Sequence, residues 1–250
     1  MKIIDTVHCW KCGSTNTRLE KMRVGRERTS RIDLQEGCED LNTYHTYHVC
    51  CSCDYRFSPY QNRYLKKIVY NQERNQKITD LALRFIKARQ SVLIFVQLIE
   101  HGNLITIALK EKLQAAGLNP ELCSFVNGAL DDESNEDVKV KFGNKTILGV
   151  TSTNIWSEGT DIPTLRWVIY AKAGKPGIEL EQVLGRALRR SPGKWRAGFV
   201  DFLDEFDTAF AVRARARQRF LELKGFAPKT LQQVPSSRKI SRFLVEKKKA

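Results

Sequence analysis

The sequence contains no long apolar run. No segment approaches the ~18 consecutive apolar residues of a transmembrane helix, and the opening residues MKIIDTVHCWKC lack the apolar core of a signal peptide. The sequence therefore gives no reason to expect a membrane as a partner. We expect an intracellular, cytoplasmic protein of a bacterial or virus-infected cell.

A phosphate loop is also missing. The motif G-x-x-x-x-G-K-[ST] needs a second glycine upstream, and neither Gly174-Lys175 nor Gly193-Lys194 has one at that spacing. The letters D-E-x-D do occur at Asp204–Asp207. Without a phosphate loop before them, we do not interpret these residues as a magnesium-binding Walker B motif.

Acidic residues are too few to balance the basic ones. The 250 residues include 42 Lys and Arg against 28 Asp and Glu, which gives a formal charge of +14 and a pI near 9.6. From Arg213 to Ala250, twelve basic residues stand against two acidic ones. This charge favours a polyanionic partner, most simply nucleic acid. Charge does not separate DNA from RNA, and of the two we expect DNA. A merely soluble basic protein is the alternative.

Seven cysteines are unusual for a reducing compartment, and four of them form two C-x-x-C pairs. Cys9 and Cys12 make the first pair, and Cys50 and Cys53 make the second, with Cys51 as a competing ligand. Two such pairs predict a closed, structural Zn²⁺ site, because each turn presents two thiolates to one metal. A redox motif or a disulfide framework fits this pattern less well. Residues 7–58 resemble a zinc ribbon.

Between the two pairs, residues 14–46 are polar and rich in arginine and lysine. This insertion is either an arm that contacts nucleic acid or a solvated loop or hairpin, and the residues alone leave both readings open. We expect a zinc-ribbon module at 1–60, a linker at 61–71, a larger domain at 72–226 and a basic tail at 227–250.

The larger domain alternates helical and strand patterns. A helix is predicted from Gln72, another from Gly102 to a stop at Gly117, and a third from Asp131. Short apolar runs without alternation are typical of strands buried on both faces. They lie at 92–96, 123–126, 147–150, 167–171 and 198–203. This order predicts an α/β fold, a parallel sheet with helices on both faces.

One predicted helix divides into an apolar and a basic stripe. Gln182, Arg186 and Arg189 are spaced to share one face, opposite a row of leucine, valine and alanine. A guanidinium suits the spread charge of a phosphoryl group in transfer. Upstream, Gly159 permits a tight turn and Asp161 offers an acceptor for a ribose hydroxyl. For the arginines alone, a solvated basic face is the competing interpretation.

These stretches resemble motifs of superfamily 2 helicases. SEGTDIP at 157–163 resembles the E-G-x-D-x-P form of motif V, and QVLGRALR at 182–189 resembles the Q-R-x-G-R-x-x-R of motif VI. Val183 departs from the pattern, because many members have arginine there. Glu73–Asn75 and Ser91–Leu104 resemble the lead-in and motif IV. Together, in this order, the motifs are far more specific than any one alone.

The resemblance implies a fold and a set of site residues. The fold is the second, C-terminal RecA-like lobe of a helicase. The catalytic residues are Arg186 and Arg189 as arginine fingers, with Gln182. The nucleotide contacts are Glu158, Gly159 and Asp161. The nucleic-acid contacts are Gln97, His101, Thr151, Ser152 and Thr153.

In such helicases the first lobe carries the phosphate loop and the D-E-x-[HD] motif. Because this chain has neither, the resemblance implies that ATP and Mg²⁺ are shared with a separate polypeptide that supplies the first lobe. One alternative is a zinc-ribbon nucleic-acid-binding adaptor without catalysis. Another, a zinc-dependent hydrolase, ranks last because a four-cysteine site leaves the metal no open position.

Overall fold

The computed structural model describes residues 16–23, 44–53, 56–57, 63–128, 131–153, 162, 164–189, 194 and 197–226. The chain divides into two compact units, Met1–Val69 and Tyr70–Ala250. The boundary lies inside the expected linker. Part of that linker, Leu65–Val69, forms a short helical turn in which Leu65, Ile68 and Val69 are buried. No helix in the described ranges is long and apolar enough to cross a membrane.

The first unit contains a three-stranded antiparallel sheet in the order β1-β2-β3. The strands are β1 Thr17–Arg23, β2 Tyr44–Cys50 and β3 Arg56–Phe57. The register pairs Thr17 with Cys50 and Arg23 with Tyr44. The two ends of the basic insertion are therefore paired as antiparallel strands. Residues 24–43, between these strands, lie outside the described part of the chain.

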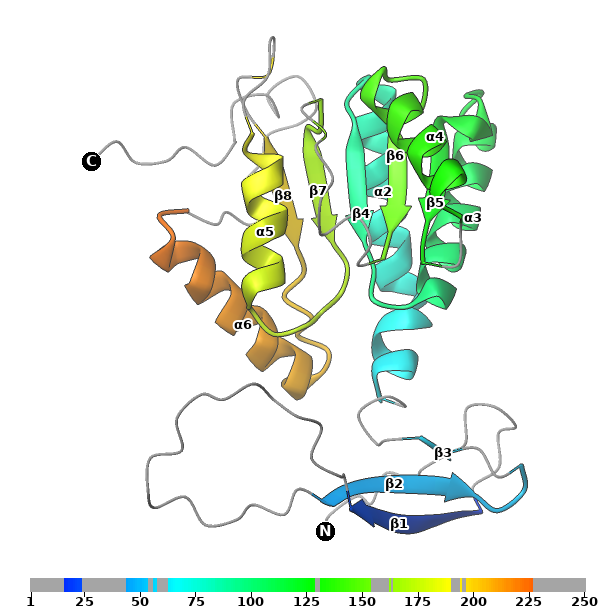
Figure 1. Cartoon of the computed structure of the whole chain (residues 1–250), viewed down its shortest axis with the longest axis vertical. Coiled ribbons are helices and arrows are strands. Elements are labelled where there is room, and N and C mark those ends of the chain that lie inside the picture. The colour runs from blue at the N-terminus through cyan, green and yellow to red at the C-terminus, as the bar shows by residue number, and fades with distance from the viewer. Residues whose placement is uncertain are drawn as a thin grey trace. The chain divides into compact units, whose positions relative to one another are not determined.

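The second unit is built on a five-stranded parallel sheet in the order β5-β6-β4-β7-β8 (Figure 1). The strands are β4 Val92–Phe95, β5 Cys123–Val126, β6 Gly149–Ser152, β7 Trp167–Tyr170 and β8 Gly198–Asp201. All residues of β4, β6 and β7 are buried, as expected for strands covered on both faces. The predicted parallel α/β sheet is confirmed.

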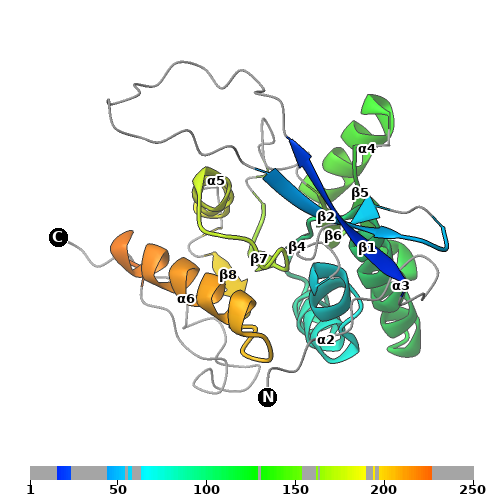
Figure 2. The same ribbon diagram turned by 90° about the horizontal axis from the view of Figure 1, so that it is seen from below.

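Helices cover both faces of this sheet. They are α2 Gln72–Lys87, α3 Ile99–Ala115, α4 Asp132–Gly143, α5 Ile178–Ala187 and α6 Thr208–Leu223, with a 3-10 turn η2 at Pro120–Leu122. Viewed along the sheet, α2 and α3 lie on one face, α4 and α5 on the other, and α6 beside β8 at the edge (Figure 2). One apolar cluster fills each face, with Ile78 and Ile105 in the first and Phe142 and Leu180 in the second.

Side-chain caps explain where three helices begin. Asn71, Asp131 and Asp207 each accept hydrogen bonds from backbone amides of the first turn of α2, α4 and α6. Helix α3 starts at Ile99 without such a cap, three residues before the predicted start at Gly102. Gly102 lies inside the helix, and a Cβ there would stand 2.2 Å from a ring carbon of Phe125, so this close approach requires glycine.

Trp167 packs closely against a glycine of the neighbouring strand. Its ring stacks on Phe85 with centroids 4.0 Å apart, and a Cβ at Gly198 would lie 2.1 Å from the ring. We expect Gly198→Ala to lower the free energy of unfolding by about 1–3 kcal/mol through overpacking, measured by urea denaturation. Gly185→Ala is the matched control. A Cβ at Gly185 would meet no described atom within 4 Å. Because alanine favours a helix more than glycine does, the free energy of unfolding should not fall. Equal losses in both variants would contradict the packing argument.

Candidate functional site

Helix α5 holds the predicted basic stripe. Leu180, Val183, Leu184 and Ala187 are buried in the core cluster of its face of the sheet. Gln182 and Arg186 are half-buried on the opposite side, as the spacing predicted. Glu179 and Glu181 lie in the first turn, where the helix dipole stabilises negative charge.

Arg189 is not part of the helix. Helix α5 ends at Ala187, Leu188 is its C-cap, and the Arg189 amide donates to the Arg186 carbonyl at 3.2 Å in a tightened last turn. Leu188, predicted to be on the apolar side, is 42% exposed. The two arginines therefore follow each other around the end of the helix instead of continuing one straight stripe.

Two described residues of the connection from β6 to β7 lie on the same face of the sheet as α5. Ile162 and Leu165, within this connection, belong to the same core cluster as Leu180 and Val183. Glu158, Gly159 and Asp161 lie outside the described residues, and their nucleotide-binding role stays a prediction.

The candidate nucleic-acid residues meet at one edge of the sheet. Phe95 and Ser152 are register partners at the carboxyl ends of β4 and β6, so Gln97 and Thr153 follow neighbouring strands. Gln97 is exposed. Thr151, Ser152 and Thr153 are buried, with Thr153 the most accessible at 9%, and the Ser152 hydroxyl donates to the Thr153 carbonyl. Because these hydroxyls are buried, a phosphate bound here would be contacted by the Gln97 side-chain amide or by main-chain groups.

His101 belongs to the interior, and its assignment as a nucleic-acid contact is not supported. Its side chain is 0% exposed, and Nε2 lies 2.9 Å from Oδ1 of Asn75 on α2. Burial and the nearby charge of Arg74 lower the pKa of His101 to about 3. The neutral imidazole therefore links α3 to α2. The sequence analysis placed His101 in a loop, because the helix was expected to begin at Gly102, the residue after it.

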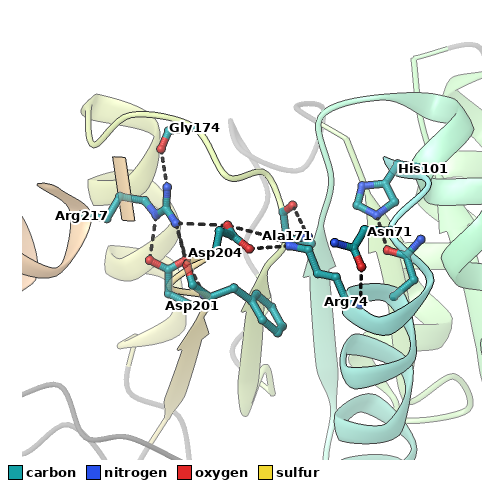
Figure 3. Close-up of polar contacts among 10 residues, drawn as sticks. Asn71, Arg74, His101, Ala171, Gly174, Asp201, Asp204 and Arg217 are labelled. Atoms are coloured by element: carbon teal, nitrogen blue, oxygen red, sulfur yellow. Dashed lines mark hydrogen bonds and ion pairs between the residues drawn. The ribbon is translucent and has the colours of Figure 1, made fainter. Parts of the chain in front are cut away.

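A buried network of charges at the carboxyl edge was not foreseen from the sequence (Figure 3). Arg74 of α2 pairs with Asp204 at 2.7 Å and donates to the Ala171 carbonyl at 3.1 Å. Arg217 of α6 pairs with Asp201 at 2.7 Å and donates to the Gly174 carbonyl at 2.5 Å. Both guanidiniums thus bind the main chain that leads from β7 into α5.

The same carboxylates explain the D-E-x-D letters. Asp204 is 5% exposed and its partner is Arg74, while Asp207 caps α6. Burial raises the pKa of the Asp201 carboxyl, and the Arg217 guanidinium opposes that shift. These acids hold the fold together, in agreement with our rejection of a Walker B motif here.

Lys172 provides a further link between β7 and α5. Lys172 is 3% exposed, and its ammonium forms an ion pair with Glu179 in the first turn of α5 and lies 5.9 Å from the Phe95 ring centroid. Burial lowers the pKa of Lys172, and the Glu179 contact opposes that shift. The start of α5 is therefore held by a side-chain ion pair as well as by main-chain contacts.

Only some of the predicted zinc ligands belong to the described residues. Cys9 and Cys12 lie outside the described residues. Cys50 is the last residue of β2, Cys51 is an exposed free thiol, and Cys53 is half-buried. Within the described ranges, no three Cys, His, Asp or Glu side chains gather as a metal site. Zinc binding stays a prediction.

Comparison with known proteins gives a match over most of the second unit. The family model of the helicase conserved C-terminal domain matches residues 73–191. The ATP-dependent DNA helicase UvsW of Enterobacteria phage T4 is 26% identical over 141 residues, which are 56% of this chain and 27% of that protein. The crystal structure of T4 UvsW superimposes with a TM-score of 0.52 and 18% identity, over 64% of this chain and 34% of that chain.

These matches establish the fold of the second unit. Its parallel sheet and helices have the RecA-like arrangement of a helicase C-terminal domain, as the motifs indicated. The chain corresponds to about a quarter to a third of the UvsW sequences it matches. The matched residues include α5 with Gln182 and Arg186, and Arg189 beyond it.

The buried His101 generates a prediction about pH. The unfolded chain gains a proton on this residue near pH 6.5, whereas the folded protein stays neutral until about pH 3. A lowered pKa means that stability is lost as the pH falls through this window. At pH 5 we expect the free energy of unfolding to be about 2 kcal/mol lower from this group alone than at pH 7.5.

Urea denaturation at both pH values measures this loss. The control variant His101→Gln keeps an amide near Asn75 but cannot titrate, so its stability should fall by roughly 2 kcal/mol less over the same interval. Equal losses in the wild-type protein and the variant would show that the imidazole does not titrate as its burial requires.

Proposed function

We propose that this chain is the C-terminal motor lobe of an ATP-dependent superfamily 2 DNA helicase or translocase whose first lobe is another polypeptide. The observation that carries the proposal is helix α5. It holds Gln182 and Arg186 on the outer side of the face that also carries Ile162 and Leu165, within residues matched by the helicase C-terminal model.

The proposed chemistry is charge stabilisation. During transfer of the γ-phosphoryl group, negative charge spreads over its oxygens, and a planar guanidinium can bind two of them. Arg186 and Arg189, at the end of α5, are the proposed donors, and Gln182 orders them. Glu158, Gly159 and Asp161 are the proposed nucleotide contacts. Because the sequence has no phosphate loop, the partner lobe is proposed to bind the ATP phosphates and Mg²⁺. Asp204 is not proposed as a magnesium ligand, because it is paired with Arg74.

The proposed DNA contacts lie at the carboxyl edge of the sheet, at Gln97 and at Thr151–Thr153. The preference for DNA over RNA is supported by the name of UvsW, an ATP-dependent DNA helicase. The basic charge of the chain supports binding of nucleic acid of either kind. Because the chain covers 27% of UvsW, helicase activity of the assembled protein is part of the proposal.

The alternative function is a nucleic-acid-binding adaptor without catalysis. The observation that favours it is the sequence itself, which pairs a basic N-terminal unit with a lobe that lacks Walker motifs. The motor is preferred, because an adaptor has no need of Gln182, Arg186 and the E-G-x-D segment together.

We also propose that the first unit binds a structural Zn²⁺ through Cys9, Cys12, Cys50 and Cys53. The support is the strand register. Thr17, five residues after Cys12, pairs with Cys50, and the Cys51 amide donates to the Asn16 carbonyl at 2.9 Å. The hairpin therefore brings the chain just after the first C-x-x-C beside the second. A closed four-thiolate site suits a fold this small.

ATP hydrolysis tests the motor proposal. We expect little hydrolysis from the purified chain alone, and DNA-stimulated hydrolysis after mixing with extract of its source. In the reconstituted mixture, Arg186→Ala should slow turnover by roughly 10³ or more, because one arginine finger is lost. DNA binding should change much less.

A matched control is Arg84→Ala, which removes an exposed arginine from α2 on the other face of the sheet. Its turnover should equal that of the wild-type protein. Normal hydrolysis by Arg186→Ala would refute the assigned role. Absence of turnover in every mixture, with salt-sensitive DNA binding retained, would favour the adaptor.

Metal analysis tests the zinc proposal. We expect about one Zn²⁺ per purified chain, and its loss in Cys12→Ser and Cys50→Ser, because each removes a thiolate from a four-ligand site. Cys51→Ser is the adjacent control and should keep the metal. Retention by Cys50→Ser with loss in Cys51→Ser would exchange the two residues, and a zinc-free wild-type protein would reject the site.

A further inference from the structure

The four arginines of α6 have different surroundings. Arg217 is 0% exposed and belongs to the buried network with Asp201. Arg213 is half-buried, with its guanidinium 5.7 Å from the Phe210 ring centroid. Arg215 and Arg219 are exposed. The four regularly spaced arginines therefore form two groups, two that pack against the domain and two that face solvent.

The two exposed arginines have no acidic partner within the described part of the chain. On α2, α3 and α4, Lys77, Lys112 and Lys141 form ion pairs with carboxylates of the same or a neighbouring helix. On α6, by contrast, Glu222 accepts a hydrogen bond from Gln218 rather than from Arg219. The full charge of both guanidiniums is therefore available to a ligand.

Arg215 and Arg219 form one stripe. Residues four apart share a helix face, and here they are about 6 Å apart along the axis. Two long arginine side chains at this separation can each reach a phosphate of the same nucleic-acid strand. Val212, 64% exposed, lies on the same face. Figure 2 shows α6 on the outer flank of the domain, beside β8 and away from α3 and α4.

The proposed DNA contacts at the carboxyl edge leave the affinity unexplained. Gln97 and Thr151–Thr153 are all uncharged, whereas nucleic-acid affinity comes mainly from cations that neutralise phosphates. Directly after α6, the sequence from 227 to 250 contains seven basic residues and one acidic residue, Glu246. The exposed stripe of α6 is therefore continuous in sequence with the most basic stretch of the chain.

We propose that the outer face of α6 is a second nucleic-acid surface, on which Arg215 and Arg219 each bind a backbone phosphate. This surface extends the proposed function, because it supplies the electrostatic part of binding and needs no ATP. It recognises the phosphodiester backbone and not the base sequence.

The test is binding of a fluorescent 20-base-pair duplex to the full chain, followed by anisotropy over a series of KCl concentrations. For the double variant Arg215→Gln and Arg219→Gln, loss of two phosphate contacts should reduce the slope of log K against log salt by about 1.8. Affinity at ~0.1 M salt should fall at least about tenfold. Circular dichroism checks that the exposed substitutions leave the fold intact.

Two further variants make the result specific. Arg84→Gln with Lys87→Gln removes the same charge from the exposed end of α2 and should leave slope and affinity near wild-type values. Arg215→Lys with Arg219→Lys keeps both charges and should retain most of the slope.

Each outcome has a separate meaning. Equal losses in the α6 and α2 variants would overturn the assigned surface, since total charge alone would explain binding. An unchanged slope in the α6 variant, with normal DNA binding, would overturn it too and leave this face to a protein partner. A wild-type chain that does not bind DNA would refute the nucleic-acid part of the proposed function itself.

Discussion

The ion pair between Arg74 and Asp204 joins parts of the domain that are 130 residues apart in sequence. Both side chains are almost completely buried, so each charge would be costly without the other. Arg74 also donates to the Ala171 carbonyl at the end of β7. A single guanidinium thus ties α2 to the end of β7 and to the segment after β8.

Arg217 repeats this arrangement from the last helix. It pairs with Asp201, lies 3.9 Å from Asp204, and donates to the Gly174 carbonyl. Together the two arginines fix the main chain between β7 and α5, and Lys172 adds an ion pair to the first turn of α5. The position of the proposed catalytic helix therefore depends on buried charges at the edge of the sheet opposite to the one where its arginines lie.

This arrangement separates the proposed tasks in space. Ile162, Leu165 and α5 share one face of the sheet, where nucleotide chemistry is proposed. Gln97 and Thr153 follow neighbouring strands at the carboxyl edge. Helix α6 serves two purposes, because Arg217 points inward to the network while Arg215 and Arg219 point to solvent. A helix needs only one side for packing, so the other side is free to carry charge for a ligand.

The sequence by itself determined the α/β class, the parallel sheet and the place of α5, because strand runs and helical periodicity are local properties of neighbouring residues. It also determined the basic charge and the helicase motifs. Tertiary structure alone decided that His101 is buried and that Arg74 meets Asp204. Such facts depend on which distant segments come into contact across the core. The spacing of residues along the chain does not predict those contacts.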